Sequence, residues 1–110
     1  MSRVLLDESV PRQFGFKLGG HHVRTVQFME WSGFKNGELL TLAAGEFDAV
    51  LTDDQNLQYQ QKYAHLDIGI IVLVARDNRF QTLLPPVPRV LKTLLTIEAG
   101  NVVEICSNPD

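Results

Sequence analysis

Residues 68–74, Ile-Gly-Ile-Ile-Val-Leu-Val, form an almost wholly apolar run. A run of this length without polar alternation is typical of a central parallel strand that is covered on both faces. Parallel strands are joined by long crossover connections, which are usually helices. The run therefore predicts an α/β fold in which the rest of the chain supplies further strands and the helices between them.

The remaining segments fit this expectation. Shorter strands are expected at Val4–Leu6, Val23–Val26, Asp48–Thr52 and Val102–Ile105. Val10, Phe14 and Leu18 recur every four residues and predict an amphipathic helix that Gly19-Gly20 ends. A second helix is expected from about residue 36, and another is expected between the proline-rich segment 85–88 and Gly100. A polar helix or turn is expected at 56–62. With 110 residues, the pattern predicts one three-layer α-β-α domain over residues 1–110.

Acidic side chains follow two of the expected strands. Asp7 and Glu8 come after the first strand, Asp53 and Asp54 come after the third, and Glu38 lies in the expected first turn of the second helix. Ligands of open parallel sheets bind beyond the carboxyl ends of the strands, so we expect residues 7, 38 and 54 at one rim. Grouped carboxylates repel one another unless a cation such as Mg²⁺ or Mn²⁺ binds between them. Taken singly, these acids are also explained by helix capping, the helix dipole or a turn.

Composition excludes several classes of protein. Ten Lys and Arg against thirteen Asp and Glu give a net charge of −3 without any basic tract, which argues against a protein that coats nucleic acid. The single cysteine, Cys106, excludes an internal disulfide framework and a four-cysteine zinc site. No apolar run approaches the roughly 20 residues that span a bilayer, so we expect no membrane contact. The absence of a disulfide framework makes the reducing cytoplasm the expected location.

Several segments together resemble a known family. They are residues 4–11 (VLLDESVP), 20–26 (GHHVRTV), 31–40 (WSGFKNGELL), 47–57 (FDAVLTDDQNL) and 59–61 (YQQ). They resemble the small PIN-like (PilT N-terminal domain-like) proteins of bacteria and archaea, more narrowly the short PIN-like group found beside toxin–antitoxin loci. The resemblance spans about residues 3–75, and its most specific parts are Leu-Leu-Asp-Glu and Leu-Thr-x-Asp-x-Asn.

This resemblance implies a Mg²⁺- or Mn²⁺-dependent endoribonuclease with a parallel sheet in the order 3-2-1-4-5. The metal-binding and catalytic acids of the family fall on Asp7, Glu38 and Asp54, and Glu8 and Asp53 are expected to support them. Many relatives carry another acid where this chain has Asn56, which can ligate through its carbonyl oxygen but adds no charge. The implied partners are RNA, a small antitoxin protein and a second copy of the chain in a homodimer.

Other polar residues near the expected rim could contact RNA phosphates. Lys35 and Asn36 precede Glu38, although Asn36 could simply cap the helix. Arg76 and Arg79 follow the fourth strand and could bind phosphate, although solvated arginines are the common case.

Two other functions remain open. Asn56 and the overall acidity fit a PIN-like binding module without catalytic activity. Asp7, Glu8 and Asp53 also resemble the acids of a receiver domain that accepts a phosphoryl group. Receiver domains carry Ser or Thr after the fourth strand and Lys after the fifth, whereas this chain has Ala75-Arg76 and Cys106-Ser107 there.

Overall fold

In the computed structural model of the chain, the described residues are 2–34, 36–53 and 66–106. The elements are β1 (Arg3–Leu6), the 3₁₀ helix η1 (Arg12–Lys17), β2 (His22–Thr25), α1 (Asn36–Ala44), β3 (Ala49–Thr52), β4 (Gly69–Val74), α2 (Phe80–Leu83), α3 (Val87–Thr96) and β5 (Val102–Cys106). Helices alternate with strands, so the predicted α/β class is confirmed.

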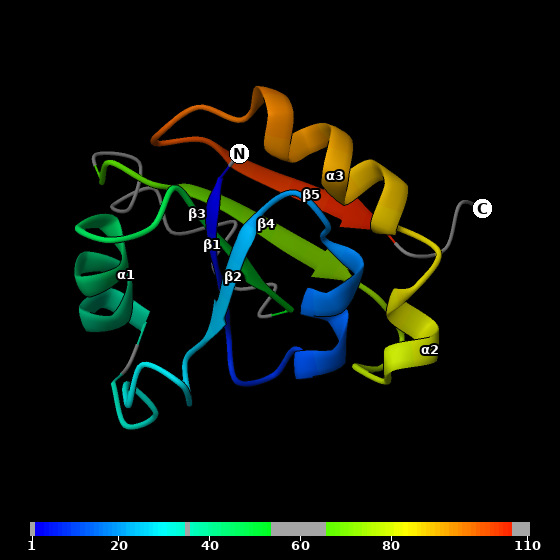
Figure 1. Cartoon of the computed structure of the whole chain (residues 1–110), viewed down its shortest axis with the longest axis horizontal. Coiled ribbons are helices and arrows are strands. Elements are labelled where there is room, and N and C mark those ends of the chain that lie inside the picture. The colour runs from blue at the N-terminus through cyan, green and yellow to red at the C-terminus, as the bar shows by residue number, and fades with distance from the viewer. Residues whose placement is uncertain (1, 35, 54–65, 107–110) are drawn as a thin grey trace.

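The strands form one five-stranded sheet in the order β2-β1-β3-β4-β5, and every pair is parallel (Figure 1). The expected order 3-2-1-4-5 differs, because β3 pairs with β1 rather than lying outside β2. The side chains explain the difference. All four residues of β3 are buried, whereas β2 alternates between exposed and partly buried residues. An apolar strand is stable between two neighbours, and a half-polar strand suits an edge.

Apolar side chains alternate between the two faces of the sheet and build a separate core on each. One core joins β1, β3 and β4 to η1, α2 and α3, with Leu6, Phe14 and Leu83 among its buried members. The other core joins the opposite faces of these strands to α1 through Leu40 and Ala43. Figure 1 shows α1 set apart from the other helices.

The first expected helix is a 3₁₀ helix of six residues rather than an α-helix. Val10, Phe14 and Leu18 are all buried as their spacing predicted. Pro11 immediately precedes the helix, and Gly15 lies within it against β2. A Cβ atom at Gly15 would lie 3.0 Å from Cγ1 of Val23, so the missing side chain permits the close approach of this segment to the sheet edge.

The later helices follow the sequence more closely. Helix α1 begins at Asn36, and α3 starts after Pro86 and ends before Gly100, as expected. The short helix α2 was not predicted, and the expected polar segment at 56–62 falls outside the described residues. Within the ranges described above, no helix has the length and apolar character that a bilayer crossing requires.

Candidate active site

The strand order places a topological switch point between β1 and β3. Strand β2 lies on one side of β1, and the later strands β3, β4 and β5 lie on the other. In open parallel sheets, the carboxyl ends of the two strands that flank such a point are the usual place for a ligand. Asp7 follows β1 and Asp53 follows β3, so both acids lie at this position.

Asp7 is held in place through both of its carboxylate oxygens. Its Oδ2 accepts hydrogen bonds from Oγ1 of Thr52 at 2.8 Å and from Oγ of Ser9 at 3.2 Å. Its Oδ1 accepts one from the backbone N–H of Glu8 at 2.9 Å, and its own N–H donates to the carbonyl of Leu51 at 2.9 Å. Asp7 is only partly buried, so the carboxylate is oriented by the protein yet accessible to solvent.

Thr52 is the residue of this site that the sequence analysis missed. It is the last residue of β3, its exposed fraction is 0%, and it is the one buried polar residue in the described part of the chain. Its hydroxyl links the ends of β1 and β3 across the switch point. A polar residue closing an otherwise apolar strand was the available signal, because a buried hydroxyl needs a hydrogen-bond partner.

The supporting acids lie beside Asp7. Asp53 directly follows Thr52 and is partly buried, whereas Glu8 is exposed. Backbone geometry therefore brings Asp7, Glu8 and Asp53 to the switch point. The sequence predicted these acids at one rim of the sheet, and the pairing of β1 with β3, which it did not predict, makes the two strand ends adjacent.

Glu38 lies in the first turn of α1 with its side chain exposed. Figure 1 shows the start of α1 on the same lower side of the molecule as the end of β1. Glu38 lines a shallow hollow of ≈ 390 Å³ with Phe34, Gly37, Thr41 and Leu42.

The other predicted residues of this region are placed only in part. Asp54, Asn56 and Lys35 lie outside the described residues, and Asn36 is described only as the first backbone position of α1. Over residues 2–34, 36–53 and 66–106, no three His, Cys, Asp or Glu side chains are grouped as metal ligands. The predicted set of Asp7, Glu38 and Asp54 includes one residue beyond those ranges.

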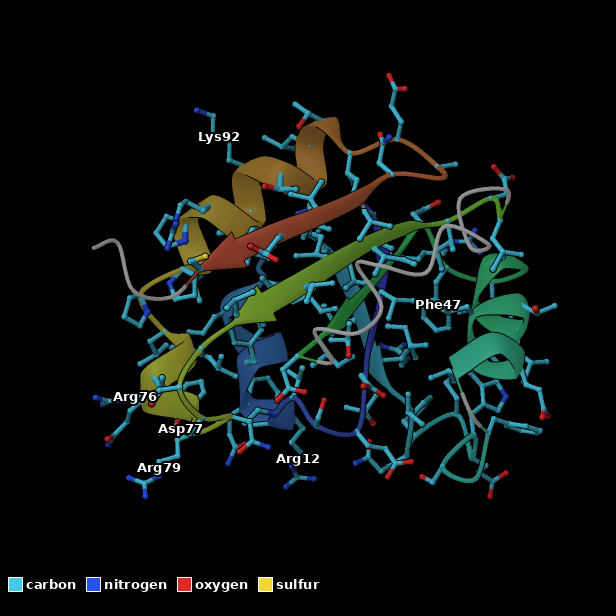
Figure 2. All side chains as sticks on the ribbon, turned by 180° about the vertical axis from the view of Figure 1, so that it is seen from behind. Arg12, Phe47, Arg76, Asp77, Arg79 and Lys92 are labelled. Atoms are coloured by element: carbon cyan, nitrogen blue, oxygen red, sulfur yellow. The ribbon has the colours of Figure 1, made fainter. Side chains whose placement is uncertain are left out.

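The loop after β4 also reaches this edge. Nδ2 of Asn78 donates to the carbonyl of Ser9 at 2.9 Å, which ties this loop to the segment after β1. Arg76 and Arg79 are both exposed, and Nε of Arg76 lies 3.7 Å from Oδ2 of Asp77. Figure 2 shows Arg12, Arg76, Asp77 and Arg79 at one end of the molecule, whereas Lys92 projects elsewhere from α3.

In this loop, the pKa of the Asp77 carboxyl is shifted from its ordinary value. Hydrogen bonds from the side chain of Thr82 and the backbone N–H of Arg79 lower the pKa of Asp77 below its ordinary value, with smaller contributions from the charges of Arg79 and Arg76. The carboxylate thus fixes the turn that leads into α2, where its Oδ1 accepts from the N–H of Arg79 at 3.0 Å, and it keeps its charge at neutral pH.

The donor set at the switch point suits a hard cation. Each carboxylate oxygen of Asp7 has two lone pairs. Thr52 and Ser9 use those of Oδ2, whereas the bond from Glu8 leaves a lone pair of Oδ1 for a cation. Outer hydrogen bonds that orient a carboxylate are the usual surroundings of a metal ligand. Carboxylate oxygens are the ligands that Mg²⁺ and Mn²⁺ prefer.

Comparison with known proteins found no matching family model, no matching curated protein and no matching solved structure.

Proposed function

We propose that this protein is a Mg²⁺- or Mn²⁺-dependent endoribonuclease of the PIN-like kind. The observation that carries the proposal is the oriented, solvent-accessible carboxylate of Asp7 at the switch point, where Oγ1 of Thr52 donates to it at 2.8 Å. A half-buried acid fixed by three donors at the carboxyl edge of a parallel sheet is suited to binding a ligand.

Asp7, Glu38 and Asp54 would hold the divalent ion. When bound, such an ion activates and orients a water molecule and neutralises charge on a phosphodiester. Thr52 and Ser9 keep the carboxylate of Asp7 in one orientation. Glu8, exposed beside Asp7, would orient or deprotonate the water molecule, and Asp53 and Asn56 would support the ligands. Arg76 and Arg79 are exposed at the same edge and would contact phosphates of the substrate, as Lys35 and Asn36 would from the segment before Glu38.

The direct test is cleavage of single-stranded RNA by the purified chain with Mn²⁺ or with a chelator. We expect cleavage only with the ion, and we expect Asp7→Asn to reduce it by at least about 100-fold. Glu98→Gln is the matched control, because this exposed acid precedes β5 and lies at the opposite edge of the sheet. Equal cleavage by the wild type and Asp7→Asn would show that the activity belongs to a contaminant.

The strand order favours a second candidate, a receiver domain that is phosphorylated on Asp53. The order β2-β1-β3-β4-β5 is that of flavodoxin-like folds, which include receiver domains. Against it, Ala75 and Arg76 follow β4, and neither provides the hydroxyl that receivers carry there. Incubation with acetyl phosphate separates the two functions: a phosphoryl group that Asp53→Asn abolishes would support the receiver and contradict the nuclease.

The PIN-like resemblance supports a cellular role as the toxin of a toxin–antitoxin pair in the cytoplasm. Its partners would be a small antitoxin and a second copy of the chain in a homodimer. Induced expression in a bacterial host tests this role. We expect growth arrest with the wild type and normal growth with Asp7→Asn at equal protein levels. A PIN-like binding module without catalysis would instead leave RNA intact in both cases while keeping its partner.

A further inference from the structure

A groove of ≈ 910 Å³ runs between η1 and the edge strand β2. Figure 1 shows these two segments side by side. The groove reaches from His21, before β2, to Arg12 and Glu8 at the carboxyl edge of the sheet. Glu8 directly follows Asp7 and donates its backbone N–H to Oδ1 of Asp7, so one end of the groove adjoins the candidate active site.

Two aromatic side chains line this groove without being packed into the core. Phe16 of η1 is 82% exposed, and Phe28, after β2, is 67% exposed. Large apolar side chains that gather on an exposed surface mark contact sites. An aromatic ring with a free face is a platform on which a nucleobase can stack.

The groove is locally basic in a chain whose net charge is −3. Two arginines, Arg12 and Arg24, line it, against the single acid Glu8. Among the described residues, neither Arg12 nor Arg24 has an ion-pair partner, since the two ion pairs there involve Arg3 and Arg76. Two unpaired guanidinium groups beside exposed rings suit a polyanion that also carries aromatic bases.

Arg24 is held in position for such a ligand. Its Nη1 donates to the carbonyl of Val23 at 2.9 Å, and its guanidinium carbon lies 5.2 Å from the centre of the Phe28 ring. The remaining N–H groups of the guanidinium are available for a phosphate. The ring and the cation are thus ordered together before any ligand binds.

The same contact argues against a peptide strand adding to the edge of the sheet. The N–H groups of His22 and Val26 donate to the carbonyls of Ser2 and Leu6, on the β1 side, so those of Val23 and Thr25 point away from β1. The carbonyl of Val23 already accepts from Arg24, and a pairing strand would have to displace that bond. A single-stranded nucleic acid needs no backbone partner on this edge.

We propose that the groove between η1 and β2 binds single-stranded RNA, with bases stacked on Phe16 and Phe28 and phosphates on Arg12 and Arg24. The proposal deepens the proposed nuclease function, because a strand lying in this groove leads to Asp7.

Fluorescence anisotropy with a labelled oligouridine of about 12 nucleotides tests the proposal. A chelator is present, so that binding is measured without cleavage. We expect the full chain to bind, Phe16→Ala and Phe28→Ala each to weaken binding roughly 5-fold or more, and Arg24→Gln to weaken it and to flatten its salt dependence. All three side chains are on the surface, and equal melting temperatures would confirm that the variants fold.

Matched controls lie on α3, away from the groove. Leu95 is 77% exposed and Lys92 is exposed, so Leu95→Ala and Lys92→Gln remove similar groups elsewhere and should leave binding unchanged. Absence of binding, or equal losses in the control and groove variants, would overturn the proposal. Tighter binding to a DNA oligonucleotide of the same length than to RNA would overturn the assignment to RNA.

The two proposals fail in different ways. If Mn²⁺-dependent cleavage requires Asp7 but is unaffected by Phe16→Ala, Phe28→Ala and Arg24→Gln, the groove proposal is wrong and the nuclease proposal stands. If RNA binds through the groove but is never cleaved, the nuclease proposal is wrong and the groove proposal stands.

Discussion

Asp7 and Thr52 show how single residues join distant parts of the chain. Their side chains are 45 positions apart in sequence and meet at 2.8 Å. Asp7 could be predicted as a site residue because an acid directly follows an apolar segment. For Thr52 the sequence offered only a polar residue at the end of an apolar strand. Its partner could not be predicted, because the contact depends on the register of β1 against β3, and that register follows from long-range packing.

Replacing Thr52 tests this link. Thr52→Val keeps the shape of the side chain but removes the donor to a charged carboxylate, so we expect it to lower the free energy of unfolding by about 1–3 kcal/mol. Urea denaturation measures the change. Thr41→Val is the matched control, because the Thr41 hydroxyl donates to Gly37 within an exposed helical turn, and its effect should stay within about 0.5 kcal/mol.

A double-mutant cycle then isolates the pair from the other contacts of Thr52. In an Asp7→Ala background, the cost of Thr52→Val should fall by about 1 kcal/mol. Strictly additive costs would show that the two side chains do not interact.

Asp77 provides a pH-dependent prediction at the residue scale. Its folded-state pKa lies below the ordinary 3.8, so its contribution to stability is present above pH 3.8 and is lost as the pH falls through the folded value. Thr82→Val removes the largest cause and should raise the pKa of Asp77 toward 3.8. NMR titration of the carboxyl carbon measures the pKa. Thr96→Val, which changes a hydroxyl on α3, should leave it unchanged.

At the scale of elements, the sequence predicted which segments are strands better than which helix type joins them. The spacing of Val10, Phe14 and Leu18 correctly indicated a buried face, yet the segment is a 3₁₀ helix. The spacing of the apolar residues shows which side chains are buried. The close approach of Gly15 to Val23 determines how tightly the backbone must turn. The latter depends on a neighbouring strand that local sequence does not specify.

The start of β4 offers a packing test between elements. A Cβ atom at Gly69 would lie 2.9 Å from Cδ1 of Ile97, the residue that directly follows α3. We expect Gly69→Ala to destabilise the fold by roughly 1–3 kcal/mol in urea denaturation, because the crowded side chain has to shift. The cost should largely disappear in an Ile97→Ala background, and an undiminished cost there would contradict this contact.

At the scale of the whole molecule, the order of the strands follows from how deeply each is buried. The wholly buried β3 and the mainly buried β4 occupy the centre, and β2 and β5 form edges with exposed positions. The α/β class was therefore predictable from apolar runs alone. The exact neighbour of β1 was not, since the expected order came from a family resemblance rather than from the burial of β2 and β3.

The candidate site, too, was predictable from the sequence only in part. Its edge of the sheet, with Asp7, Glu8 and Asp53, followed from the alternation of elements. The fixing of Asp7 by Thr52 and Ser9, and the aromatic and basic groove beside it, depend on side chains brought together by the fold.

Thermal unfolding of the full chain during Mn²⁺ titration tests the central claim, that Asp7 at the switch point helps to bind a divalent ion. At free Mn²⁺ ten times its Kd, linkage predicts about 1.4 kcal/mol of stabilisation, a rise in Tm of roughly 5 °C or more for a domain of this size. Asp7→Asn should abolish the rise, and Glu98→Gln should retain it. An unchanged Tm in the wild type, or an equal rise in Asp7→Asn, would contradict the account.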